Sequence, residues 1–197
     1  IQHVKEKGGI TVDFNGNIID KGFAFSILDK ADEVRIKIDS PSFKSDFIKK
    51  FNELKEKYGA QKGAHFGGWE EGNELVVDIA KVGDDMLQSI YDGIIKKQDA
   101  IGDLGKYAAT GGKEGTIYIS KEIVDSLEPI SGRSLREAGS SFGSWAEVVS
   151  YYGSKDFKNP ISYKELIRGG VSRQSLTVTR TLAQQRNRQF FNFVKNI

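Results

Sequence analysis

Residues 64–82 constrain the fold more than any other stretch of this sequence. The segment from Ala64 to Trp69 reads as one strand, and the apolar run from Leu75 to Val82 reads as a second strand. The residues between them (70–73, Glu-Glu-Gly-Asn) have the composition of a tight turn. We therefore expect an antiparallel hairpin. Because an isolated hairpin is only marginally stable in water, the rest of the chain has to cover the apolar side chains of these two strands.

Strands and a helix are predicted before this hairpin. The pattern of apolar and polar residues predicts strands at 10–14, 22–28 and 34–38. The Asn-Gly-Asn turn signal at 15–17 predicts that the first two strands are antiparallel neighbours. A helix is predicted to begin at Ser40-Pro41 and to end at Gly59. Its buried stripe consists of residues at helical spacing: Phe43, Phe47, Phe51, Leu54 and Tyr58.

The second half is predicted to be mainly helical. Beyond Gly83 the apolar spacing predicts a helix with Met86, Leu87, Ile90, Ile94 and Ile95 on its buried face, then short strands at 100–101 and 116–119. Further helices are predicted at 120–127, 135–138, 144–152, 162–167 and 172–194. The fold class is α+β, with a small mainly antiparallel sheet and two helices in a domain at 1–105. A linker or mobile loop at 106–115 leads to a mainly helical domain at 116–197.

The composition narrows the chemistry. The chain has no cysteine, which excludes disulfides, cysteine-zinc sites and thiol nucleophiles. Its 38% hydrophobic and 28% charged residues are typical of a globular protein. No apolar run has the length of a membrane span, and the first seven residues lack the apolar core of a secretory signal. Because the first residue is not Met, we expect that the mature chain begins after a cut. No membrane partner is expected.

Charge is distributed unevenly along the chain. The net charge is only +2, but residues 168–197 contain six basic side chains and no acidic one. The other 167 residues hold 23 basic and 27 acidic side chains. A basic C-terminal segment on a weakly acidic body favours a polyanionic partner.

The same C-terminal segment contains a loose likeness to a DNA-binding motif. Residues 163–176 resemble a helix-turn-helix, with Gly170 in the turn and Ser172 as the cap of the second helix. Leu166 and Thr179 depart from the usual small and apolar residues at those places. The resemblance implies that Arg173, Gln174 and Thr177 would face the major groove. The nucleic-acid-binding candidates are these three residues and the basic residues of the last helix: Arg173, Gln174, Thr177, Arg180, Arg186 and Arg188.

His65 is the best single candidate for catalysis. Histidine is the usual acid or base near neutral pH, and Asp78, Glu70 or Glu71 could orient it. The alternative is a histidine that only packs in its strand. No cofactor or metal site is expected, because the two histidines are far apart and no carboxylate cluster has a metal-ligand spacing. The Gly-Gly-Lys at 111–113 is followed by Glu114, which excludes the Walker phosphate loop. No Gln/Glu-x-Glu pair of an ADP-ribosyltransferase occurs in the sequence.

Several short motifs in the first half match one known pattern. They are a Gly-Gly-Ile-Thr start, a Gly-Phe strand, Ala-His-x-Gly-x-Trp, a Val-Asp strand and Gln-x-Ala-Ile-x-Asp-Leu. The pattern resembles a small domain of unknown function found in bacteriophage and mobile-element proteins. The matching residues are Gly8, Gly9, Ile10, Thr11, Gly22, Phe23, Ala64, His65, Gly67, Trp69, Val77, Asp78, Gln98, Ala100, Ile101, Asp103 and Leu104. The resemblance implies a location in the host cytoplasm or the virion, and it implies no mechanism.

Three functions remain open from the sequence. The leading hypothesis is a phage or mobile-element accessory protein that binds nucleic acid, or another polyanion, through its basic C-terminal region. A second is a phage-borne effector enzyme or nuclease that uses His65. A third is a structural component of the virion whose partners are other virion proteins. The oligomeric state is left open.

Overall fold

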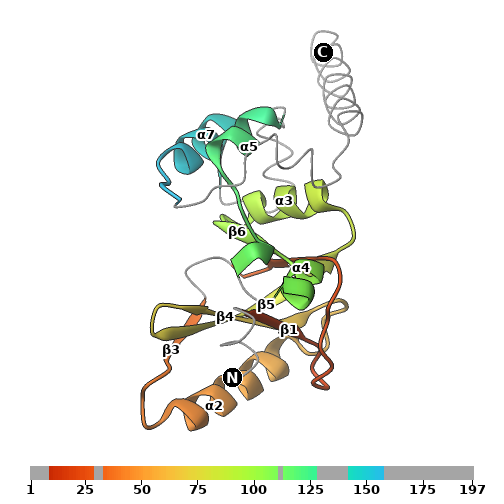
Figure 1. The fold of residues 1–197 in the computed structure, drawn as a ribbon, viewed down its shortest axis with the longest axis vertical. Coiled ribbons are helices and arrows are strands. Elements are labelled where there is room, and N and C mark those ends of the chain that lie inside the picture. Colours follow the sequence, from red (N-terminus) through yellow and green to blue (C-terminus); the bar gives the residue numbers. More distant parts are fainter. Residues whose placement is uncertain (1–8, 29–32, 111–112, 128–141, 158–197) are drawn as a thin grey trace, which may run out of the picture. The chain divides into compact units, whose positions relative to one another are not determined.

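The structure, a computed structural model, describes residues 9–28, 33–110, 113–127 and 142–157 (Figure 1). The chain divides into two compact units, Ile1–Ile117 and Tyr118–Ile197. Within the described residues, strands of the first unit and β7 form one seven-stranded sheet, and the second unit contributes two helices, α5 and α7. The α+β fold class predicted from the sequence is confirmed.

The predicted hairpin lies at the centre of the sheet. Strand β4 (His65–Glu71) pairs antiparallel with β5 (Glu74–Gly83) over seven residue pairs. The two residues between the strands begin with Gly72 at a φ of 63°, the backbone conformation that glycine adopts without strain. The register places Gly67 opposite Asp78 and Gly68 opposite Val77.

The other strands are added to both sides of this hairpin. Strand β1 (Gly9–Val12) pairs with β4, while β2 (Phe23–Ser26) and β3 (Val34–Lys37) pair with opposite ends of β5. Strand β6 (Ala100–Asp103) pairs with β2, and β7 (Thr116–Tyr118) completes the order β1-β4-β5-β2-β6-β7. Every strand pair for which the register is known is antiparallel.

The predicted pairing of the first two strands is wrong. β2 is antiparallel to β5 and β6, not to β1. The turn between them does form, because the Asp13 carboxylate accepts backbone N–H groups of Asn15 and Asn17, both at 2.8 Å. Beyond that turn the chain makes only the bridge between Val12 and Ile18 beside β1. Ten-residue β5 offers a longer edge, so β2 pairs there.

Helix α2 (Phe43–Tyr58) covers one face of the sheet with its predicted aromatic stripe. Phe47 and Phe51 both meet the ring of Phe66 edge-on, with centroids 5.7 and 4.9 Å apart. The helix begins after Ser42, two residues later than predicted, because residues 40–42 form a turn in which Phe43 N–H donates to the carbonyl of Ser40.

Helix α3 (Met86–Ile95) covers the other face, as Figure 1 shows. It contacts β2, β5 and β6, and its Met86, Ile90 and Ile94 are buried as predicted. The Asp85 side chain caps it by accepting the N–H of Gln88 at 2.7 Å. The sheet of the first unit is therefore covered on both faces, and polar groups on its strands can be buried.

The range predicted to be a linker, 106–115, contains regular structure. Helix α4 (Leu104–Thr110) occupies its first part and the 3-10 turn η2 (Lys113–Gly115) its end. Tyr107 explains the difference, since its ring fills the space over Gly102 and Gly115, where an added Cβ would come within 2.9 and 2.7 Å of it. Its hydroxyl also lies 2.7 Å from that of Thr116. Gly115, one of the glycines that suggested a loop, instead accommodates a packed ring.

The described part of the second unit has two capped helices in contact, α5 (Lys121–Ser126) and α7 (Trp145–Gly153). Ser120 caps α5, as predicted. In α7, Ser144 accepts the N–H of Glu147, whose carboxylate accepts the N–H of Gly143 at 2.8 Å. The predicted helices at 135–138, 162–167 and 172–194 lie outside the described residues. Among the described helices, none is long and apolar enough to cross a membrane.

Candidate functional site

Two of the three residues predicted to be catalytic share one face of the sheet. Side chains alternate along a strand, so His65 and Gly67 point away from α2, whereas Glu70 points toward the side that α2 covers. Asp78 lies opposite Gly67 on β5 and therefore shares the face of His65. The structure thus brings His65 and Asp78 together and leaves Glu70 on the other side.

Asp78 is held in a space that a glycine provides. Its side chain is buried, with only 4% of the residue exposed. A Cβ atom added at Gly67 would lie 2.1 Å from Oδ1 of Asp78. The carboxyl group therefore lies directly over the Gly67 backbone, where no other residue type fits without displacing it.

Two further side chains act on this carboxyl group. Ser26 lies on β2 opposite Ala80, on the same face, and its side chain favours the ionised form of Asp78. The Ser26 hydroxyl oxygen also accepts the backbone N–H of Leu28 at 3.2 Å. Glu33, just before β3, adds a negative charge near the carboxyl group.

These surroundings hold the proton on Asp78. Burial raises the pKa of Asp78 from its ordinary 3.8 to about 7. The Ser26 side chain opposes this shift by favouring the ionised form, and the charge of Glu33 adds to it. Asp78 can therefore gain or lose a proton near neutral pH, which an ordinary surface carboxylate cannot do.

His65 is the half-buried neighbour of this group. It pairs with Ala80, so it is a diagonal neighbour of Asp78, with Cα atoms roughly 7 to 8 Å apart in such a ladder. Its Nδ1 atom is buried, and among the described residues it has no hydrogen-bond partner. An unpaired ring nitrogen in this position can accept or donate a hydrogen bond if a ligand or water reaches it. We name His65, Asp78 and Ser26 the β-face cluster.

The structure does not test the other predicted sites. All six nucleic-acid-binding candidates, Arg173, Gln174, Thr177, Arg180, Arg186 and Arg188, lie outside the described residues, as does the helix-turn-helix likeness at 163–176. In the described ranges, no group of three or more metal-ligating side chains could hold a metal ion.

Sequence reasoning missed Ser26 and Glu33. The alternation in 22–28 does place Ser26 on one face of a strand, but which strand lies beside it follows only from the β2–β5 pairing. Glu33 precedes β3, and its approach to Asp78 likewise depends on β3 lying along β5. Both are long-range contacts that no local pattern indicates.

Comparisons of the chain with protein-family models, curated proteins and solved structures find no match.

The raised pKa of Asp78 predicts a specific pH dependence of stability. Between about pH 4 and 7 the folded chain keeps this proton while the unfolded chain releases it, so rising pH favours unfolding. The stabilisation from this proton is fully present below about pH 4 and is lost above about pH 7. Between these values the free energy of unfolding falls by up to about 1.4 kcal/mol per pH unit. Asp78→Asn stays neutral, so its stability relative to the wild type should increase between pH 4 and 8. Urea unfolding across this range measures it; parallel curves for the two proteins would contradict the prediction.

Two adjacent glycines should respond differently to the same substitution. Gly67→Ala puts a methyl group within 2.1 Å of the Asp78 carboxyl oxygen, so it should lower the free energy of unfolding by about 2 kcal/mol or more. Gly68→Ala is the matched control, since its Cβ meets its nearest atoms at 3.5 to 3.7 Å. Chemical denaturation of both variants measures the difference, and equal stabilities would show that the Gly67 space is not needed.

Proposed function

We propose that the protein binds nucleic acid, or a similar polyanion, through its basic C-terminal segment, residues 168–197. The observation that carries this proposal is the charge distribution: six basic side chains and no acidic one in thirty residues, after a body that is weakly acidic. Neutralising phosphates with such a segment releases condensed counterions and drives binding without sequence recognition.

Charge pairing in the described body supports this assignment. Arg35 lies between Glu71 and Glu74, at 2.7 and 3.3 Å, with Glu33 at 3.7 Å. Lys50 is likewise paired with Glu53 at 2.6 Å. Cations held by carboxylates in this way attract phosphate weakly, because the local field is already neutralised.

Any sequence preference would come from the helix-turn-helix likeness at 163–176. In that arrangement Arg173 would read guanine and Gln174 would read adenine in the major groove. The remaining basic side chains, Arg180, Arg186 and Arg188, would contact phosphates and position the helix.

The salt dependence of binding tests the proposal. If all six basic residues contact phosphates, the logarithm of the association constant should fall with the logarithm of salt concentration with a slope of about −5. Replacing Arg173, Arg186 and Arg188 together by Gln should reduce this slope by about 3, because three contacts are lost. Fluorescence anisotropy with labelled single- and double-stranded DNA and RNA measures both.

A matched control uses three lysines of the body, Lys49, Lys57 and Lys62, replaced together by Gln. This variant changes the net charge by the same amount and should bind as the wild type does. The proposal fails if the wild type does not bind at low salt, or if the arginine and lysine variants lose affinity equally.

A second function is favoured by the β-face cluster. His65, with a buried and unpaired Nδ1, and Asp78, which titrates near neutral pH, lie on one face of the central hairpin. This pair has the residue types of a general acid–base centre, in which His65 would exchange the proton and Asp78 would modulate it electrostatically. A nuclease or another hydrolytic effector is the class of enzyme that would use it.

Incubation with labelled DNA and RNA, with and without divalent metal ions, tests this second function. Cleavage by the wild type should be abolished in His65→Ala while the melting temperature stays within a few degrees, because a half-buried side chain contributes little packing. Glu70→Ala is the control and should cleave normally, since Glu70 lies on the other face. Absence of cleavage by the wild type, or unfolding of His65→Ala, would leave the histidine a structural residue.

A further inference from the structure

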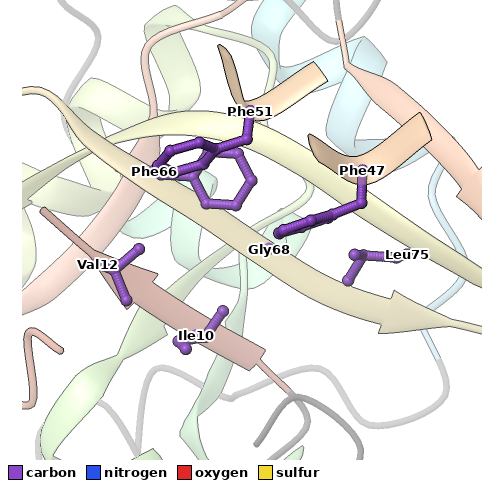
Figure 2. A pocket seen from close by; sticks show the side chains of 7 residues that line it. All are labelled: Ile10, Val12, Phe47, Phe51, Phe66, Gly68 and Leu75. Carbon is purple, nitrogen blue, oxygen red and sulfur yellow. The ribbon is translucent and has the colours of Figure 1, made fainter. Parts of the chain in front are cut away.

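An apolar hollow of about 180 Å³ lies between α2, β4 and β1, on the face opposite the β-face cluster. Figure 2 shows the side chains that line it: Ile10, Val12, Phe47, Phe51, Phe66 and Leu75, together with the backbone of Gly68. Almost all of the lining surface is carbon. A space of this size and chemistry retains water poorly and accepts an apolar group.

Gly68 is the reason that the hollow exists. It lies opposite Ile10 of β1 and Val77 of β5, and its missing side chain leaves the floor of the hollow as bare backbone. Its backbone does not require glycine, since a Cβ there would make only ordinary contacts at 3.5 Å or more. An alanine would fit this strand and take up part of the space, so the hollow is not a consequence of backbone geometry.

The rim of the hollow is apolar as well. Ile18, 52% exposed, forms the bridge to Val12, and Ile48, 49% exposed, is adjacent to Phe47 on α2. Among the described residues these two are the exposed large hydrophobic side chains. Each is the neighbour of a residue that lines the hollow, Ile18 across the bridge to Val12 and Ile48 along the chain from Phe47.

Lysines of α2 lie on the side of the helix that faces the loop after β1, a loop that also carries the Asp13 carboxylate. An α-helix turns by about 100° per residue. Three residues of α2 therefore lie within about 60° of Phe51 around the helix axis, on the side toward the loop after β1: Lys44, Ile48 and Lys55. Lys55 Nζ donates to the carbonyl of Phe14 at 3.1 Å, and the Phe14 ring packs against Phe51 with centroids 6.3 Å apart. The ammonium group keeps further N–H donors for an anion.

The acidic residues of α2 do not share this side of the helix. Asp46, Glu53 and Glu56 lie about 140° or more from Phe51 around the helix axis. An anion beside Lys55 would therefore meet attraction from lysine and little repulsion from the same helix.

We propose that this hollow binds a small carboxylate with a short apolar tail, with the tail between Phe47, Phe51 and Gly68 and the carboxylate at Lys55. The volume of the hollow determines the size of the apolar tail, because a cavity of about 150 Å³ lined by Leu, Ile and Phe holds one benzene ring. Lys55 favours a carboxylate as the head group, because an ammonium–carboxylate pair is stronger than a neutral hydrogen bond. A ligand of this size binds with a dissociation constant on the order of 1 mM.

The probe is 3-phenylpropionate, titrated at millimolar concentrations into the full chain and followed by ¹H–¹⁵N NMR. Saturable shifts are expected at Ile10, Val12 and Gly68. The neutral amide of the same acid should bind about fivefold more weakly, and propionate, which has no ring, should not bind measurably.

Substitutions locate the site. Gly68→Val fills the hollow and should abolish binding; if this variant is unfolded, Gly68→Ala replaces it and should weaken binding severalfold. Lys55→Gln should reduce the affinity for the acid to that for the amide, whereas Lys49→Gln, on the outer face of α2, should have no effect. The proposal is overturned if 3-phenylpropionate causes no saturable shifts, if filling the hollow leaves binding unchanged, or if acid and amide bind equally.

Discussion

The antiparallel ladder between β4 and β5 is the interaction on which the rest of the first unit depends. Its register decides which side chains face α2 and which face α3, because a shift by one residue would exchange the two sets. The Gly72 turn fixes that register locally, and the ten residues of β5 then provide edges for β2 and β3. The β-face cluster and the apolar hollow both owe their composition to this one register.

Two neighbouring glycines in β4 create spaces on opposite faces of the sheet. Over Gly67 the space is filled by the Asp78 carboxyl group, which becomes buried and keeps its proton to near neutral pH. Over Gly68 the space stays open and is lined by aromatic and aliphatic side chains. The same residue type therefore produces a titratable cluster on one side and an apolar hollow on the other. The difference arises from the neighbours, not from the glycines themselves.

Much of the fold could be predicted from the sequence, because its signals are local. The central hairpin, the stripe of α2, the buried face of α3 and the cap of α5 all follow from periodicity, turn residues and capping side chains. The partner of β2 and the helix in the expected linker could not be predicted in this way. Both depend on long-range contacts: the exposed edge of β5 in one case, and the packing of Tyr107 on Gly102 and Gly115 in the other.

The candidate site likewise combines features that the sequence alone indicates with features that only the tertiary structure reveals. The sequence alone determined the candidate residues His65 and Asp78 and the separation of a basic C-terminal segment from an acidic body, since residue type and charge need no coordinates. Only the tertiary structure decided that Asp78 lies over Gly67, that Ser26 reaches it and that Glu70 does not share its face. The physical reason is that burial and proximity depend on which strands pair. Strand pairing joins residues far apart in the chain, which local patterns do not encode.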